Sequence, residues 1–149
     1  MPIDPSYAGR TYPPSDPYEV GVEKIREFAD ALGDPNPAYR DREAARALGH
    51  PDVIAPPTFP FVLTFQASRA LVDDPVLGID YSRVVHGEQR FAHTRPVRAG
   101  DALTVTVTLE TVRSAGGHDM LTSRSDVATV EGEHVVTAWS TLVVRGEGS

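Results

Sequence analysis

Cysteine is absent from the 149 residues of this chain. Its absence excludes disulfides, thiolate metal sites and a cysteine nucleophile, and it is typical of proteins from the reducing cytoplasm. Long hydrophobic runs are also missing, since no apolar stretch approaches the roughly 20 residues that a membrane-spanning helix requires. The first residues show no basic region followed by an apolar one, so the sequence predicts no secretory signal. We therefore expect a cytoplasmic protein with no membrane partner.

Positive charge is scarce as well. Lysine and arginine together number 14 against 21 acidic residues, which gives a formal net charge of −7. Contacts to nucleic-acid phosphates need concentrated positive charge, so we expect no nucleic-acid partner. All but one of the cationic residues are arginine. This bias reflects either codon usage in a GC-rich genome or a need for bidentate ligands to phosphate or carboxylate. Three arginines of one short stretch are candidates for the second role: Arg90, Arg95 and Arg98.

The first half of the sequence predicts three helices, in a single domain that spans residues 1–149. Over residues 22–32 the apolar side chains recur at helical spacing. A short second helix is expected over residues 41–48. The third helix is expected to begin at Thr58 as N-cap and to end near residue 71. Its apolar residues are not confined to one stripe, which predicts burial on most sides.

The second half predicts antiparallel strands. Leucine and valine alternate with threonine over residues 103–110, a period of two. Gly116-Gly117 and the stretch 131–133 have the composition of hairpin turns. Further strands are expected near residues 84–94, 119–130 and 135–145. Helices followed by antiparallel strands predict an α+β domain, and a buried third helix predicts a strongly curved sheet wrapped around it, the hot-dog fold.

The loop after the first predicted helix is stiffened by two prolines. It reads Gly33-Asp34-Pro35-Asn36-Pro37 and ends at Tyr39. A rigid loop removes the entropy cost of positioning a reactive group. Asp34 is therefore a candidate catalytic carboxylate and Asn36 a candidate amide ligand. The alternative is that both side chains only hydrogen-bond their own loop, as Asp and Asn before proline often do.

This loop resembles the hydratase motif Gly-Asp-x-Asn-Pro-x-His of the MaoC-like hot-dog enzymes, which include (R)-specific enoyl-thioester hydratases and (3R)-hydroxyacyl-carrier-protein dehydratases. The stretches at 55–59, 86–89 and 95–101 are similar to the MaoC N-terminal type. The resemblance covers nearly the whole chain. It places the catalytic aspartate of the family at Asp34 and the catalytic histidine at Tyr39.

The resemblance implies reversible addition of water to the double bond of an acyl thioester, with no metal and no cofactor. Asp and His would activate the water, and a helix N-terminus would bind the thioester oxygen. Thr58 and Phe59 are the candidate donors. The second base is missing here, because a phenol ordinarily has a pKa of about 10 and an imidazole of about 6.5. Tyr39 therefore leaves independent catalysis in doubt.

Other residues are candidates for completing the site. His86 and Glu88 are predicted to share one strand face, where the pair would act as base and orienting group. Three apolar side chains of the third helix join Phe59 as candidates for an acyl tunnel, with ordinary core packing as the alternative: Phe61, Val62 and Phe65. The three arginines are candidates for gripping the phosphate of a carrier protein or of phosphopantetheine.

The sequence thus predicts a subunit of a (3R)-hydroxyacyl-thioester dehydratase, a lyase of fatty-acid biosynthesis, that mainly binds the acyl group of acyl-ACP or acyl-CoA. The expected assembly is a homodimer or a heterodimer with a catalytic hot-dog subunit, because exposed sheet edges are usually completed by partners. Two alternatives remain open. One is a self-sufficient hydratase or thioesterase that uses Asp34 with Tyr39 or His86. The other is a non-enzymatic acyl-thioester binding module.

Overall fold

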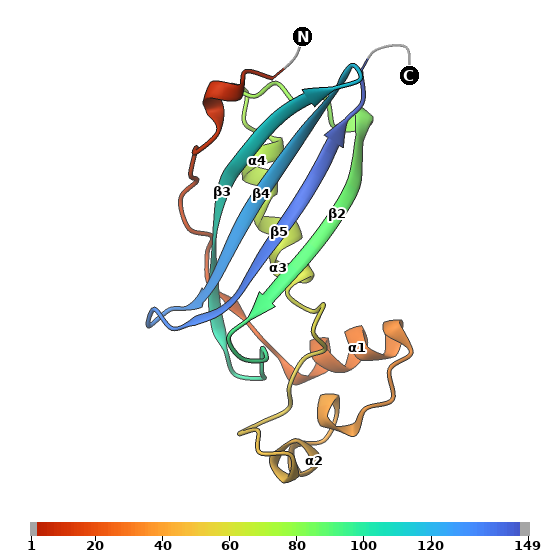
Figure 1. Cartoon of the computed structure of the whole chain (residues 1–149). Helices are drawn as coiled ribbons and strands as arrows, with labels where there is room; N and C mark the ends of the chain where they lie inside the picture. Colours follow the sequence, from red (N-terminus) through yellow and green to blue (C-terminus); the bar gives the residue numbers. More distant parts are fainter. Residues whose placement is uncertain (1–2, 147–149) are drawn as a thin grey trace.

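A computed structural model describes residues 3–146 and contains one five-stranded antiparallel sheet in the order β1-β3-β4-β5-β2 (Figure 1). The sheet is strongly curved, and helices α3 (Phe61–Ala67) and α4 (Arg69–Val72) lie against its concave face (Figure 1). This confirms the predicted hot-dog fold. The strands are β1 (Tyr18–Glu19), β2 (Val84–His93), β3 (Ala102–Ala115), β4 (His118–Thr129) and β5 (His134–Val144).

The long strands follow from the alternation of apolar and polar residues. In β3 the side chains of Leu103, Val105, Val107 and Leu109 are at most 2% exposed, because they all point to the concave face. Gly116 and Gly117 have positive φ angles of 60° and 81°, the geometry that a two-residue hairpin turn needs. The turn joins β3 to β4, and their register runs from the pair Ala115↔His118 to the pair Leu103↔Thr129.

Helices α1 (Val22–Leu32) and α2 (Arg42–Ala47) form at the predicted positions. Gly33 ends α1 in a left-handed conformation, with φ at 72°. Asp41 caps α2, since its side chain accepts a hydrogen bond from the Glu43 N–H. Both helices lie beyond one end of the sheet, away from α3 and α4 (Figure 1).

The prediction that the third helix begins at Thr58 is wrong. Residues 57–60 form turns, and α3 (Phe61–Ala67) begins after Pro60. No side-chain hydrogen bond caps the N-terminus of this helix. Phe59 precedes Pro60, and a residue before proline is disfavoured in the helical conformation. The N–H groups of Phe61 and Val62 accordingly donate to carbonyls three residues back, as in turns. Ser68 separates α3 from α4 (Arg69–Val72), and its hydroxyl donates to the Phe65 carbonyl at 2.7 Å. Phe65 itself is 48% exposed, so one side of this helix is uncovered.

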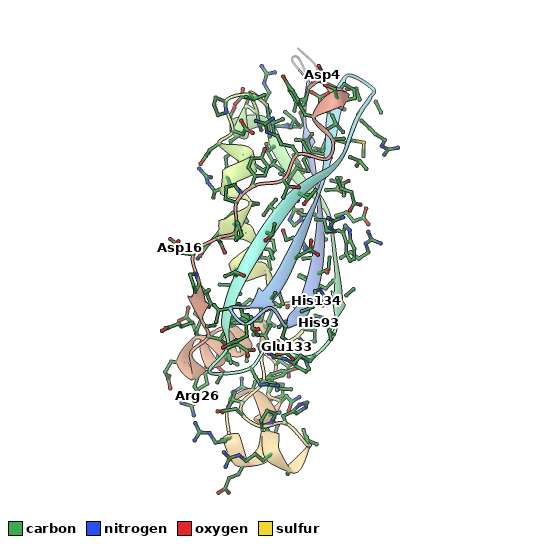
Figure 2. All side chains as sticks on the ribbon, turned by 90° about the vertical axis from the view of Figure 1, so that its left-hand side faces the viewer. Asp4, Asp16, Arg26, His93, Glu133 and His134 are labelled. Atoms are coloured by element: carbon green, nitrogen blue, oxygen red, sulfur yellow. The ribbon has the colours of Figure 1, made fainter. Side chains whose placement is uncertain are left out.

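The hydrophobic core fills the space between the concave face and the helices. Its largest fully buried side chains include Phe59, Ile25, Leu71, Leu103 and Leu109. Phe28 of α1 meets Phe59 edge-on, with ring centroids 5.4 Å apart. A side view shows helices on one side of the sheet and side chains without a covering helix on the other (Figure 2). None of the helices within residues 3–146 has the length and hydropathy to cross a bilayer.

The two edges of the sheet differ. The N-terminal segment 9–15 runs along β3 and covers its outer edge beyond the short β1, with backbone N–H groups of Gly9, Tyr12 and Ser15 donating to carbonyls of β3 at 2.7–2.9 Å. At the opposite edge β2 pairs with β5 alone within the described residues. Most residues of β2 are exposed. One long strand edge is therefore open to a partner.

Candidate active site and acyl cavity

The proline-stiffened loop is held by its own side chains. The Asp34 carboxylate accepts a hydrogen bond from the Asn36 N–H at 3.0 Å, and the Asn36 side chain accepts one from the Ala38 N–H at 3.0 Å. The Asp34 N–H donates to the Ala29 carbonyl and so ties the loop to the end of α1. These contacts give Asp34 and Asn36 a definite structural role. In the part of the chain that the structure describes, Asp34 is bonded through Oδ1, so its second carboxylate oxygen is the one that a water or substrate would contact.

Tyr39 lies inward from this loop. Its side chain belongs to the hydrophobic core together with Ile25 and Ala29 of α1, and the residue is only 7% exposed. A phenol in this position packs as a core side chain and is poorly placed to exchange protons with water. Asp34, Asn36 and Tyr39 are neighbours in this loop, and the buried Tyr39 offers no exposed base beside the carboxylate.

The predicted oxyanion donors differ in their contacts. The Phe59 N–H donates to the Pro56 carbonyl at 2.9 Å, and the Phe59 ring is fully buried. Thr58 is exposed on the turn that precedes α3. Of the two candidates, Thr58 therefore remains the candidate donor, because the Phe59 N–H is already bonded.

A cavity of about 120 Å³ lies between the helices α3 and α4 and the concave face of strands β2, β4 and β5. Phe61 and Phe65 line it, whereas Phe59 and Val62 do not. The last two pack in or against the core instead. The remaining apolar walls come from α4 and from the strands: Leu71, Val72, Val84, Ala138 and Leu142.

His86 lies at this cavity, but its partners differ from those predicted. A register shift between His86 and Glu88 interrupts the pairing of β2 with β5. The prediction that the Glu88 carboxylate orients His86 is therefore not fulfilled. The imidazole Nε2 instead lies 3.0 Å from the Glu88 carbonyl oxygen and 3.0 Å from the Ser140 hydroxyl. Its ring stacks on Phe61, with centroids 5.7 Å apart.

The loop and the cavity are separate in this chain. None of the described residues that line the cavity comes from the segment 33–41. His86 and Asp34 thus do not meet in one cavity within a single chain. Within residues 3–146 no group of three or more His, Cys, Asp or Glu side chains has the arrangement to hold a metal ion.

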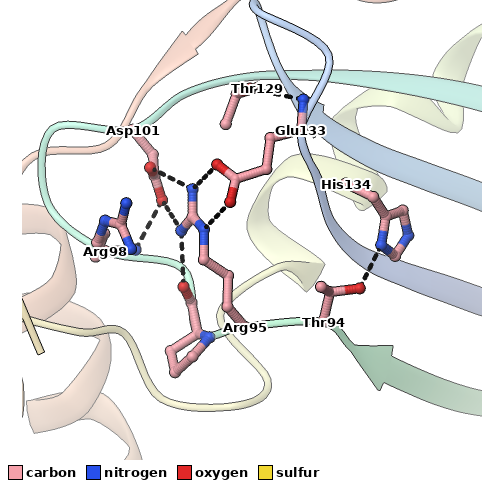
Figure 3. A network of polar contacts seen from close by, with 8 residues as sticks. Thr94, Arg95, Arg98, Asp101, Thr129, Glu133 and His134 are labelled. Atoms are coloured by element: carbon pink, nitrogen blue, oxygen red, sulfur yellow. Dashed lines mark hydrogen bonds and ion pairs between the residues drawn. The ribbon is translucent and has the colours of Figure 1, made fainter. Parts of the chain in front are cut away.

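Arg95 and Arg98 come together at Asp101, whereas Arg90 packs on Trp139. Arg95 makes two hydrogen bonds of 2.9 Å to the Asp101 carboxylate and further contacts to Glu133 (Figure 3). The bonds to Asp101 raise the pKa of Arg95 above its ordinary value, and Arg95 in turn lowers the pKa of Glu133. This network pins the turn 95–101 to the β4–β5 hairpin. Arg90 stacks on the Trp139 ring at 4.2 Å, and the Arg98 N–H donates to Asp101.

Comparison with known proteins places this geometry in a family. A FAS1-like dehydratase domain region model matches residues 6–138. Among solved structures, a MaoC-like dehydratase superimposes with a TM-score of 0.87 at 33% identity, covering 95% of this chain and 43% of that larger chain. The HadBC (3R)-hydroxyacyl-ACP dehydratase complex from Mycobacterium tuberculosis gives a TM-score of 0.81 at 32% identity, covering 92% and 96%. These matches define a dehydratase-type hot-dog domain.

Two relatives match over nearly their whole length. A UPF0336 protein of Streptomyces coelicolor is 63% identical over 145 residues, covering 97% of both chains. A UPF0336 protein of Thermobifida fusca is 52% identical over 147 residues, covering 99% of this chain and 97% of that protein. The chain therefore belongs to the MaoC-like hot-dog dehydratase family.

Sequence reasoning missed the polar side of the cavity. Ser123, Ser125 and Ser140 line it, together with Gln89 and Thr64. A signal was present, because Ser123 and Ser125 stand between Leu121 and Val127 in the core-facing phase of β4. Two serines at positions where alternation demands apolar residues indicate a face that is not wholly core.

Proposed function

We propose that this chain is the acyl-binding subunit of a (3R)-hydroxyacyl-thioester dehydratase, a hydro-lyase that also runs as an enoyl hydratase. Its family supports the reaction class, and the cavity beside α3 supports the binding role. The substrate would be an acyl group carried on acyl-carrier protein or coenzyme A. No step requires a metal or cofactor, since acid–base groups and a bound water complete the reaction.

One observation supports the assignment of acyl binding to this chain and of proton transfer to a partner. The hydratase loop and the cavity do not meet within the chain, and the loop has a buried phenol in place of an exposed base. Losing one member of an acid–base pair costs on the order of 10²–10⁴ in rate. A second hot-dog subunit with an intact Asp and His would supply the missing proton transfers. This chain would supply the acyl site.

The open edge of β2 supports the pairing. An exposed strand of ten residues, Val84–His93, is a template for a further strand. Val84, His86 and Gln89 of the same strand line the cavity, so a partner paired along β2 would lie next to the cavity. The edge at β3 is already covered by the segment 9–15. The partner would therefore be another hot-dog subunit, joined through β2 as a homodimer or heterodimer.

The test is hydration of crotonyl-CoA by the pure chain, by a hot-dog subunit that carries the full Asp and His motif, and by their mixture. We expect weak or no activity from the pure chain and full activity from the mixture. Asp34→Asn in this chain should leave the activity of the mixture within a few-fold, whereas the corresponding change in the partner should abolish it.

Two results would contradict the proposal. Strong hydration by the pure chain that Asp34→Asn removes would make it a self-sufficient enzyme. Binding of acyl-CoA without turnover in any mixture would make it a non-enzymatic binding module. Tyr39→His gives a further check, because restoring the motif should raise the activity of the isolated chain if only one group is missing.

A further inference from the structure

The concave face of the sheet carries a row of polar side chains at the cavity. Ser123 of β4 is paired with Ser140 of β5, and Ser140 is paired with Gln89 of β2. These three residues therefore form one rung across three adjacent strands, about 5 Å apart from strand to strand. Ser125 stands two positions further along β4 on the same face. The face of a sheet that packs on helices is ordinarily apolar, so this rung is unusual.

One member of the rung has buried polar atoms without a partner. Among residues 3–146 the Gln89 side chain stands out, because its amide nitrogen and oxygen are both buried and neither makes a hydrogen bond. Ser123 and Ser125, only 5% and 4% exposed, turn their side chains to the same cavity. Buried polar groups are nearly always hydrogen-bonded, so unpaired ones in a cavity indicate a ligand or water that pairs with them.

The rest of the cavity limits the shape of that ligand. Its other walls are largely apolar, with Phe61, Leu71 and Leu142 among them. Its volume of about 120 Å³ is somewhat smaller than the cavity of roughly 150 Å³ that accepts benzene in another protein. About five non-hydrogen atoms fill such a space. The rung itself offers neutral donors and acceptors. Arg69 also lines the cavity, but its guanidinium is paired with Asp73 and lies over the Tyr81 ring.

We infer that the cavity selects a short acyl group that bears a neutral oxygen, a keto or hydroxyl group, several carbons from the thioester. This rests on the proposed function and specifies its substrate class. The apolar walls hold the carbon chain, and the serine hydroxyls bond to the oxygen. The Gln89 amide gains its missing partner when the ligand enters. An unsubstituted chain leaves the rung unpaired, and a long chain exceeds the space.

Calorimetric titration of the full chain with hexanoyl-CoA and 5-oxohexanoyl-CoA tests this, because the two probes differ by one carbonyl oxygen. We expect the oxo compound to bind about tenfold more tightly, the effect of one hydrogen bond to an otherwise unpaired buried group. The double variant Ser123→Ala, Ser125→Ala should lose this preference while still binding hexanoyl-CoA. The control Thr122→Ala removes a hydroxyl from the other face of the same strand and should keep the preference.

Each outcome decides a different claim. Equal affinity of the two thioesters for the wild-type chain would overturn the inference and leave the proposed function intact. A preference that survives in the double serine variant would show that the oxygen binds elsewhere and would also overturn it. Failure to bind either thioester would overturn the proposed function, and the inference with it.

Discussion

Replacing Gln89 by methionine should stabilise the protein. Methionine is similar to glutamine in length and volume and has no strong hydrogen-bonding group, so the change removes a buried unpaired amide and preserves packing. A buried polar group without a partner costs about 1–3 kcal/mol. Both polar atoms of this side chain are buried and unpaired. We therefore expect Gln89→Met to raise the free energy of unfolding by about 2 kcal/mol.

The assay is thermal unfolding at a fixed protein concentration, because association shifts the midpoint. For a chain of about 150 residues each kcal/mol moves Tm by roughly 2–4 °C, so the variant should melt about 6 °C higher. Gln66→Met is the matched control, since Gln66 is exposed on α3. Its effect should stay within about 0.5 kcal/mol. A lower Tm for Gln89→Met would show that the amide is paired in solution and would refute the reasoning.

Three further predictions concern the sheet edge, the arginine network and acid stability. Val85→Lys places a charge on the exposed edge of β2 and should shift sedimentation toward the monomer mass of 16.1 kDa, whereas Val130→Lys in a turn should not. Arg95→Met removes the cationic partner of the buried Asp101 carboxylate and should cost about 3 kcal/mol in chemical unfolding. Glu133→Gln, at the exposed end of the same network, should cost less than about 1 kcal/mol. The Tyr12 hydroxyl donates to Asp74 and lowers the pKa of this carboxylate below its ordinary value of 3.8. The ionised Asp74 therefore stabilises the protein above pH 3.8, and this stabilisation is lost as the pH falls further. Stability measured against pH should therefore decline less steeply below about pH 4 in Asp74→Asn.

Local patterns in the sequence were enough for most of the fold. Alternation fixed the phase of β3, and Gly33 and Gly117 marked a helix end and a hairpin turn because both need positive φ angles. The start of α3 was missed because Thr58 is a good cap by composition, whereas Phe59 before Pro60 is disfavoured in the helical conformation and α3 begins at Phe61. The Pro-rich segment 9–15 has no periodic pattern of apolar residues that would predict its pairing with β3. The position of this segment depends on long-range backbone hydrogen bonds alone.

The site was predictable as a set of residues but not as an arrangement. The loop motif identified Asp34 and Asn36, whose contacts within the loop follow from local chemistry. Whether His86 meets Asp34 depends on how a strand and a loop far apart in sequence are placed by the whole fold. The bulge after His86 also could not be predicted from the alternation of apolar and polar residues. A shift of one residue changes the face on which the following side chains lie. The cavity could not be predicted either, because its lining depends on how β2, β4 and β5 are aligned with one another.

The difference between the two sheet edges limits how many chains can associate by strand pairing. A sheet with two open edges can add strands at both without limit, which is how fibrils grow. Here the segment 9–15 closes one border, so growth by strand pairing stops once a single companion has docked on the other. A chain without residues 9–15 would expose the β3 edge as well, and we expect such a chain to associate through both edges.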